Sequence, residues 1–553
     1  MLPLIRAQSP EDGIPVTDPL VIAKCGSCHT RDDRGNMLRL SWERATPEGW
    51  EEVLKRMIRL EGVNLTPPEA RAILKYLGTA HGLAPEEAKP VMFFAERRVQ
   101  EENDIPSGIL RETCARCHAF ARALSWRRSF EDWKELANLH VALSPQADET
   151  LRLGFHAGSP PDLNGPSKTL PGEQAVAALS KIAPLHTPEW TAWSARMKAP
   201  KLAGRWLVSA HLLGRGTYFG EMTIEPGDAD GEFATHVTLR SISDGSTVVR
   251  SGHSLVYAGY AWRGRSKGDH TVASAPDDLS SDMREVLWIA PDQSQAEGRW
   301  FWGQYQEFGF DVKLQRASSD ATLIGIDRSA MKAGSQANRV RLIGDNFPSS
   351  VAPADLNFGA GVTVRRVVSA APNEIVAEVD IAADAAPGKR DIAFRQSIVP
   401  GALALYDRID YVKVVPESAM TQFGSPTQPQ GYQQFEAIAY QRGPDGQPHT
   451  PDDLELGPVD VTWSLEEMYT APGNNTDAVG RLSATGLFTP ATVGRANNHD
   501  VWVIAKAQNE KDKNGRPLVG KAYMVVSVPT YMFDGRRYVR DLDRWVEEGP
   551  GTR

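Results

Sequence analysis

The stretch CGSCH, residues 25–29, decides the fold of the N-terminal part of this chain, and CARCH, residues 114–118, repeats its pattern. In each, two cysteines are separated by two residues, and a histidine follows the second cysteine directly. This spacing is typical of c-type haem attachment, in which two thiols form thioethers with the haem vinyl groups and the histidine binds the iron. The sequence therefore predicts two covalently bound haems.

These two motifs use all four cysteines of the chain. A four-cysteine zinc site could use both pairs, but it needs no histidine after each pair. Two redox-active dithiols are a further alternative, although nothing around the motifs indicates the strand–helix unit of a thioredoxin. We favour haem attachment. The predicted thioether residues and proximal iron ligands are Cys25, Cys28, His29, Cys114, Cys117 and His118.

An internal repeat indicates the sixth iron ligands. SWERATPEGWEEVLKRM, residues 41–57, aligns with SWRRSFEDWKELANLH, residues 125–140, and each segment reads as a capped amphipathic helix. The seventh residue after the second tryptophan is Met57 in one copy and His140 in the other. Both side chains can bind haem iron, and seven residues is about two helical turns, so each shares a face with its tryptophan.

We therefore assign His29 and Met57 to the iron of haem I, and His118 and His140 to the iron of haem II. The alternative is that Met57 is a core methionine and His140 a hydrogen-bonded core histidine. Further candidates lie within reach in the sequence: Met37, Met92, His81 and His156. Of these, His81 reads as the end of a helix that stops at Gly82.

The unlike ligands predict unlike reduction potentials. A thioether ligand generally raises the haem potential relative to two histidines. Two haems of different potential in one chain suit a short electron relay with a preferred direction. Because neither iron would have an open position, oxygen or peroxide chemistry is disfavoured.

Composition limits partners and location. The net charge of −9 argues against a nucleic-acid partner, and no apolar run approaches the roughly 18 residues of a membrane span. The start, MLPLIRAQSPEDG, lacks the apolar region of a signal peptide, so either that region is removed before this chain begins or the chain stays in the cytoplasm. In the bacterial c-type cytochromes that these motifs resemble, thioether attachment is completed outside the cytoplasmic membrane. We therefore expect a periplasmic protein.

Beyond residues 161–174 the sequence becomes rich in β-strand patterns separated by turn residues such as EPGDADG and SDGS. Segments with this pattern include WLVSAHL (206–212), TYFGEMTIE (217–225), EFATHVTLRSI (232–242), SLVYAGYAW (254–262), RWFWGQY (299–305) and FDVKLQR (310–316). Shorter strands at sandwich-like spacing follow. The predicted fold is multidomain: an all-α dihaem cytochrome c domain over 1–170, with repeats over about 15–90 and 100–165, an antiparallel β-barrel over 187–317, and immunoglobulin-like β-sandwiches over 318–415 and 416–545.

This β-rich part contains no P-loop, dinucleotide fingerprint or nucleophile elbow. We predict no catalytic residue in it.

Together with the two haem motifs and the β-rich tail, TPEGWEEVLKRM and KYLGTAHGLAP resemble the α subunit of quinohemoprotein amine dehydrogenase. The resemblance covers essentially the whole chain in order and size. It implies an αβγ heterotrimer with a β-propeller subunit and a small γ subunit that carries cysteine tryptophylquinone. It further implies oxidative deamination of primary amines at that quinone, with electrons leaving through the haems to a soluble carrier such as azurin or a cytochrome c.

Because all four cysteines serve the haems, this chain cannot itself carry a cysteine-linked quinone. The amine chemistry would belong to a partner, and the β-domains would be scaffold for the other subunits. One alternative is a stand-alone dihaem cytochrome whose immunoglobulin-like domains bind a surface or polymer. A third is a dihaem peroxidase-like enzyme, which would need one haem to open a coordination site.

Overall fold

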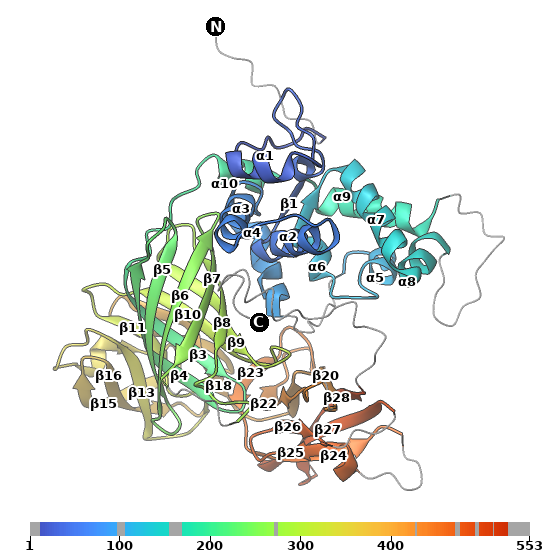
Figure 1. Cartoon of the computed structure of the whole chain (residues 1–553). Coiled ribbons are helices and arrows are strands. Elements are labelled where there is room, and N and C mark those ends of the chain that lie inside the picture. Colours follow the sequence, from blue (N-terminus) through green and yellow to red (C-terminus); the bar gives the residue numbers. More distant parts are fainter. Residues whose placement is uncertain are drawn as a thin grey trace.

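A computed structural model describes residues 11–96, 105–153, 169–269, 275–425, 428–469, 476–492, 497–512 and 514–528. Figure 1 shows a helical domain packed on one side of an upright β-barrel, with two further β-domains around the opposite end of the barrel. The predicted order, a helical domain followed by an antiparallel barrel and two β-domains of several sheets, is confirmed.

The first repeat of the helical domain is built around two long helices. Thr46 caps α2 (Pro47–Leu60) and Thr66 caps α3 (Pro67–Ala80), each followed by a proline, which has no N–H to lose at a helix start. The buried face of α2 includes Trp50, Val53 and Leu54 at helical spacing. The other elements are α1 (Pro19–Cys25), η1 (Leu40–Trp42), β1 (Glu43–Ala45), α4 (Pro85–Ala88) and η2 (Lys89–Glu96).

The second repeat has the same plan. Ser129 caps α7 (Phe130–Leu143), which packs against α9 (Pro171–Ile182) as α2 packs against α3. Trp50 Nε1 donates to the carbonyl oxygen of His81, just past the end of α3, at 2.8 Å, and Trp133 Nε1 donates to that of Ala183, just past α9, at 3.1 Å. The remaining elements are α5 (Gly108–Thr113), α6 (Ala121–Leu124), β2 (Trp126–Arg128), α8 (Pro145–Asp148), η3 (Glu149–Leu153) and α10 (Pro188–Ser194).

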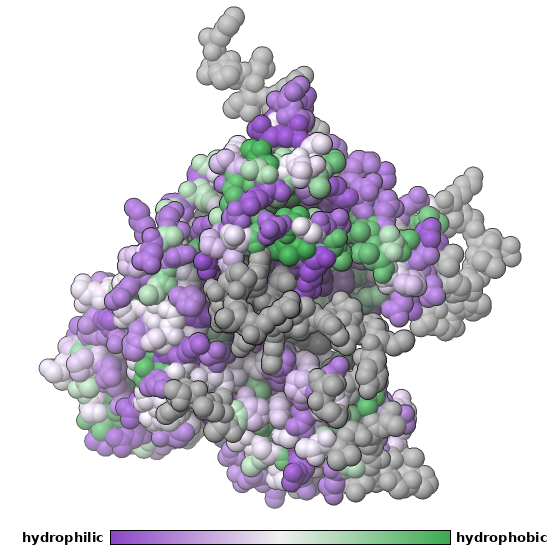
Figure 2. Space-filling view, viewed as in Figure 1, coloured by the Kyte–Doolittle hydropathy of each residue, from purple (hydrophilic) through white to green (hydrophobic). Residues whose placement is uncertain are grey.

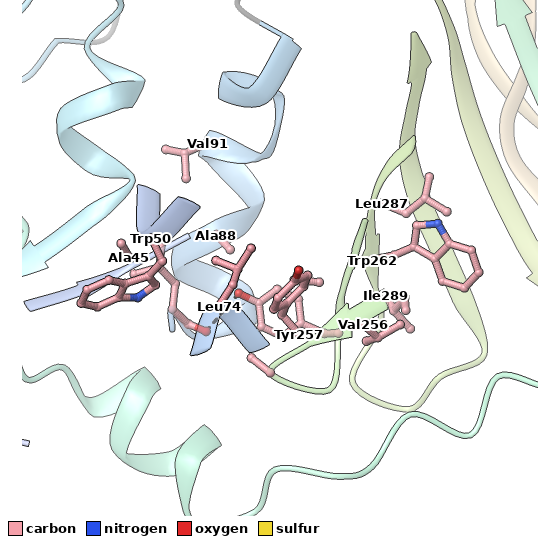
Figure 3. Packing of buried hydrophobic residues seen from close by; sticks show 14 of the residues in the cluster. Ala45, Trp50, Leu74, Ala88, Val91, Val256, Tyr257, Trp262, Leu287 and Ile289 are labelled. Carbon is pink, nitrogen blue, oxygen red and sulfur yellow. Dashed lines mark hydrogen bonds between the residues drawn. The ribbon is translucent and has the colours of Figure 1, made fainter. Parts of the chain in front are cut away.

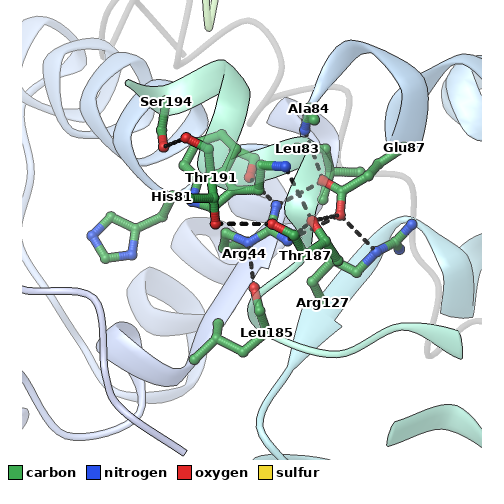
Figure 4. Close-up of polar contacts among 12 residues, drawn as sticks. Arg44, His81, Leu83, Ala84, Glu87, Arg127, Leu185, Thr187, Thr191 and Ser194 are labelled. Carbon is green, nitrogen blue, oxygen red and sulfur yellow. Dashed lines mark hydrogen bonds and ion pairs between the residues drawn. The ribbon is translucent and has the colours of Figure 1, made fainter. Parts of the chain in front are cut away.

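A short antiparallel ribbon joins the two repeats. Strand β1 pairs with β2 so that Arg44 lies opposite Arg127. Both arginines bind the buried carboxylate of Glu87: Arg44 through two hydrogen bonds of 2.8 and 3.0 Å, and Arg127 through one of 3.2 Å (Figure 4). Thr187 Oγ1 also donates to this carboxylate at 2.8 Å. Glu87 therefore ties both repeats to the segment that leads into the barrel.

The charge of Glu87 is balanced where it is buried. Burial opposes ionisation, but the hydrogen bonds and positive charge of Arg44, with the charge of Arg127, outweigh it and lower the pKa of Glu87 to about 2. Arg44, which is fully buried, also donates to the carbonyl oxygens of Gly82 and Leu185.

The barrel is closed by eight antiparallel strands in simple sequence order, with the last strand pairing with the first. Inward-facing residues alternate along each strand, as the sequence pattern predicts; in β5 these include Phe233, Val237 and Leu239. The strands are β3 (Gly204–Leu212), β4 (Gly216–Pro226), β5 (Glu232–Ser241), β6 (Thr247–Tyr257), β7 (Ala261–Gly268), β8 (Met283–Ile289), β9 (Gln295–Trp302) and β10 (Phe308–Arg316).

The helical domain and the barrel share one hydrophobic core (Figure 3). Gly78 on α3 lies so close to Tyr257 that an added Cβ would be 2.8 Å from its ring. Arg263 on β7 forms an ion pair with Glu48 on α2. Trp288 Nε1 on β8 donates to the carbonyl oxygen of Pro85 at 2.9 Å. These contacts hold the helical domain in one orientation on the barrel.

The third domain has two four-stranded sheets around its own core. One contains β11 (Thr322–Ile326), β13 (Asn338–Asp345), β16 (Glu374–Ile381) and β15 (Val362–Ala371); the other contains β12 (Ala330–Lys332), β18 (Ser397–Tyr406), β17 (Gly388–Phe394) and β14 (Leu356–Asn357), which follows η4 (Pro353–Asp355).

The fourth domain also has a separate core. Its largest sheet contains β20 (Ser418–Gln422), β28 (Pro517–Ser527), β27 (His499–Lys511) and β24 (Val461–Glu467). A second sheet contains β19 (Tyr411–Val415), β22 (Glu436–Gln441) and β23 (Leu454–Pro458). A third contains β21 (Gln433–Gln434), β26 (Leu487–Pro490) and β25 (Gly480–Leu482), and η5 (Thr476–Ala478) contacts β25. No helix in the described parts of the chain is both long and apolar enough to cross a membrane.

Candidate haem sites

The first Cys-x-x-Cys-His motif lies in a tight turn at the end of α1. Asp18 caps this helix, and Cys25 is its last residue. The backbone N–H groups of Cys28 and His29 both donate to the carbonyl oxygen of Cys25, at 3.2 and 2.9 Å. The turn therefore holds the two thiols and the imidazole close together. Cys25 is half-buried, Cys28 is exposed, and neither is in a disulfide.

The imidazole of His29 is oriented by the backbone. Its Nδ1 lies 2.9 Å from the carbonyl oxygen of Leu38. Because a carbonyl oxygen only accepts, Nδ1 carries the hydrogen and Nε2 keeps the lone pair. This is the tautomer that an iron-binding histidine requires, and the hydrogen bond fixes the ring orientation.

The second motif repeats this arrangement at the end of α5. Ser107 caps that helix, and Cys114 follows its last residue. Cys114 is half-buried and Cys117 is exposed, and both thiols are free. The Nδ1 of His118 lies 3.0 Å from the carbonyl oxygen of Ala119, so this ring is also held by a backbone carbonyl.

Met57 and His140 occupy equivalent positions on α2 and α7. The two tryptophans that define the repeat make the same hydrogen bond in both copies, and each candidate ligand lies two turns further along its helix. Met57 is half-buried beside the core, whereas His140 is exposed. The Nδ1 of His140 lies 2.8 Å from the carbonyl oxygen of Leu136, which leaves its Nε2 with the lone pair.

These residues fit two c-type haems. Each set has two free thiols and a histidine whose Nδ1 lies against a carbonyl oxygen, and the two helix residues add a thioether and an imidazole. Apolar side chains are exposed beside them: Leu38 at 52%, Leu60 at 65% and Leu143 at 63%. Figure 2 shows apolar residues gathered on the helical domain over α2 and over α5 and α8. Such surface suits a flat apolar macrocycle.

The competing candidates have other surroundings. His81 caps the C-terminus of α3, as its sequence context predicts, and its fully buried ring lies between Trp50 and Tyr76. Burial lowers the pKa of His81 to about 4. Met37 is fully buried, and Met92 packs on the barrel against residues of β8 and β9. His156 lies outside the described residues.

The four-cysteine zinc alternative is not supported. Across the described ranges, no group of three or more His, Cys, Asp or Glu side chains is placed to hold a metal ion. The two cysteine pairs therefore stay separate.

Sequence reasoning missed the residues that join the two sites. Arg44 and Arg127 each lie six residues before the repeat tryptophan. This matched position was the available signal. Their shared partner Glu87 is more than 35 residues from either arginine, and no local pattern indicates it.

Comparisons with solved structures give only partial overlaps. A redesigned β-barrel, mFAP1, bound to DFHBI is 15% identical, with 21% of this chain and 94% of that chain covered and a TM-score of 0.18. Human protocadherin-24 EC1-2 is 13% identical, covering 38% and 99% with a TM-score of 0.17. Drosophila OTK extracellular domains 3-5 are 8% identical, covering 60% and 87% with a TM-score of 0.14. Likenesses of this size carry no argument about function.

Comparison with curated proteins finds no match. Family models, in contrast, match nearly the whole chain in order. Residues 16–152 match the haem-binding domain of the quinohemoprotein amine dehydrogenase alpha subunit. Residues 199–317, 320–407 and 412–536 match domains II, III and IV of the same subunit. The chain belongs to the family of quinohemoprotein amine dehydrogenase alpha subunits, whose N-terminal domain binds haem.

Proposed function

We propose that this chain is the electron-transfer subunit of a periplasmic quinohemoprotein amine dehydrogenase and is not itself catalytic. Two covalently bound c-type haems would accept electrons from a cysteine tryptophylquinone on a partner subunit, after oxidative deamination of primary amines, and pass them to a soluble carrier. The observation that carries this proposal is the pair of Cys-x-x-Cys-His motifs at the ends of α1 and α5, with Met57 and His140 at matched positions of the two repeats.

The proposed ligand sets are unlike. Cys25, Cys28 and His29 would hold haem I with Met57 as its sixth ligand. The second haem would be held by Cys114, Cys117, His118 and His140. Bound haem supplies one-electron redox chemistry, and a thioether ligand raises its potential relative to a second imidazole. The chain's own contribution is to fix each histidine tautomer through a backbone carbonyl.

The rigid mounting of the helical domain favours electron transfer over a tethered role. Tyr260 Oη in the barrel donates to the carbonyl oxygen of Leu83 at 3.0 Å, in addition to the ion pair between Arg263 and Glu48. A shared core and buried polar contacts keep the haem sites at fixed distances from any subunit bound to the β-domains.

The quinone would be on another chain because the four cysteines serve the haems. We expect the partners to be a β-propeller subunit and a small quinone-bearing γ subunit, and the carrier to be azurin-like or a cytochrome c. Periplasmic location follows from the expected site of thioether attachment. No nucleic-acid partner is expected at a net charge of −9.

Gentle purification from native periplasm tests the proposal. We expect two co-purifying subunits and a mass of this chain increased by two haems under denaturing conditions, because thioether bonds survive unfolding. A chain that carries two haems but purifies alone and binds a glycan or matrix polymer would favour the alternative of a stand-alone cytochrome. Peroxide turnover by the isolated chain would favour the peroxidase-like alternative.

A further inference from the structure

The barrel interior contains a row of polar residues next to apolar and aromatic ones. Cross-strand pairing places Ser254 of β6 opposite Gly264 of β7, Gly264 opposite Glu285 of β8, and Glu285 opposite Trp300 of β9. All four positions lie on the inward face of their strands, because they alternate with residues that face outward. Thr235 of β5 lies diagonally next to Ser254 on the same face.

Four polar atoms in this row have no hydrogen-bond partner among the described residues: Thr235 Oγ1, Ser254 Oγ, Glu285 Oε1 and Trp300 Nε1. Their residues are only 6%, 5%, 1% and 0% exposed. Buried polar groups are almost always hydrogen-bonded, because leaving one without a partner in a low-dielectric interior costs its full desolvation. Four such atoms on neighbouring strands indicate a bound partner.

The surrounding groups form a built site. Trp262 Nε1 donates to Glu285 Oε2 at 3.1 Å and so holds the carboxyl group in place. A Cβ added at Gly264 would lie 2.8 Å from Glu285 Oε2, 2.8 Å from Trp262 Nε1 and 3.1 Å from Ser254 Cβ. Gly264 therefore allows these side chains to converge where any other residue would separate them.

The charged neighbour of Glu285 does not satisfy it directly. Arg250 of β6 donates to Ser266 Oγ at 3.1 Å and to the carbonyl oxygens of Ser266, Leu279 and Ser281. Burial raises the pKa of Glu285, and hydrogen bonds from the Ser266 and Trp262 side chains, together with the charge of Arg250, only partly oppose this. Glu285 Oε1 itself has no hydrogen-bond partner among the described residues, so a small hydrogen-bonding molecule is still required there.

The donor and acceptor pattern restricts what this molecule is. Trp300 Nε1 can only donate, so its partner must accept, which a metal cation or an ammonium ion cannot do. An ionised Glu285 Oε1 can only accept, so its partner must donate. Water does both. Large, fully buried side chains also lie in the barrel, including Trp206, Trp262 and Phe310.

We propose that the barrel encloses a short chain of bound water molecules that links Thr235, Ser254, Glu285 and Trp300. A chain is needed because strands lie about 4.8 Å apart, so the outermost of these groups are too distant to share one water. Buried waters of this kind typically have two to four polar partners, which the row supplies. This water chain is a structural ligand of the scaffold and is independent of the haem sites.

A crystal structure of the purified haem-containing protein, at a resolution that shows ordered water, tests this directly. We expect water density within hydrogen-bonding distance of Glu285 Oε1 and Trp300 Nε1. An empty interior, a molecule larger than water, or side chains turned to hydrogen-bond other protein groups would overturn the proposal.

Variants give a second test. Glu285→Met keeps the side-chain length but removes both oxygens, so the water bound at Glu285 should be lost. Asp311→Asn is the matched control: Asp311 is on the outer face of β10, 52% exposed, and bound to Arg299, so the water inside the barrel should be unchanged. If Glu285→Met does not fold, magnetic relaxation dispersion of water on the wild-type protein counts the long-lived internal waters. A count of zero would refute the inference.

Discussion

Replacing Glu87 by glutamine removes the charge that joins the two repeats of the helical domain. The neutral amide would leave Arg44 and Arg127 buried with no carboxylate between them. The pKa of Glu87 is lowered from 4.5 to about 2, and each unit corresponds to about 1.4 kcal/mol. The carboxylate therefore contributes about 3 kcal/mol to folding at neutral pH, which agrees with the roughly 3–5 kcal/mol lost when one partner of a buried ion pair is removed.

The pH dependence gives this prediction a distinct signature. Because the pKa of Glu87 is lower in the folded state, its stabilisation is fully present above pH 4.5 and is lost as the pH falls towards 2. We expect the stability difference between wild type and Glu87→Gln to be about 3 kcal/mol at pH 7 and to shrink through that window. Denaturant unfolding followed by haem absorption reports on the helical domain.

Glu131→Gln is the matched control for Glu87→Gln. Glu131 pairs with Lys134 on the surface of α7, where solvent screens the interaction, so this variant should unfold like the wild type. Equal stability of Glu87→Gln and wild type, or a difference that does not change with pH, would refute the reasoning.

Four further substitutions test other parts of the account. Met57→Leu should lower the reduction potential of one haem or make that haem high-spin, and His140→Ala should alter only the other haem. Redox titration and visible spectra of each variant check this. Unchanged spectra in Met57→Leu would show that the repeat alignment is wrong. In the wild type, burial keeps the folded His81 imidazole neutral down to about pH 4, while the unfolded one takes up a proton near pH 6.5, so the folded state loses up to about 3 kcal/mol of stability as the pH falls from 6.5 to 4. His81→Phe has no such group and should not show this loss. Identical acid unfolding curves for the two proteins would contradict this. Gly49→Ala should destabilise the helical domain by about 1–2 kcal/mol despite the helix preference of alanine, because the new Cβ would lie 2.9 Å from the Cβ of Ala45 and 3.0 Å from the Trp126 ring. Gly108→Ala is the control and should not destabilise the domain, because its Cβ would meet nothing within 4 Å. Equal melting temperatures for the two variants would refute the steric argument.

Local patterns predicted the parts of the fold that depend on neighbouring residues. The helices that contain Met57 and His140 begin at capping residues that are visible in the sequence, and the barrel strands alternate as expected. The segment SLVYAGYAW, residues 254–262, reads as β-rich but does not reveal where its strands begin and end. It contains the end of β6, a turn and the start of β7, because Ala258 and Gly259 adopt positive φ angles of 49° and 75°.

Long-range features were not predictable from one sequence. Strand β8 was missed because its apolar run, residues 286–289, is short and has no unambiguous period. The position of α9 beside α7, beyond the range 100–165 predicted for the second repeat, depends on tertiary packing. The same holds for Glu87 and for the polar row in the barrel, whose members come from strands that only the closed barrel brings together.

The central claim is that this chain transmits electrons from amine oxidation on a partner subunit. The most direct measurement is to add a primary amine anaerobically to the native periplasmic preparation and follow haem absorption, with the isolated haem-containing chain as control. We predict reduction of the haems in the native preparation and none in the isolated chain. Reduction of the isolated chain by amine would contradict the placement of the quinone on a partner, and no reduction in either preparation would contradict the electron-transfer role.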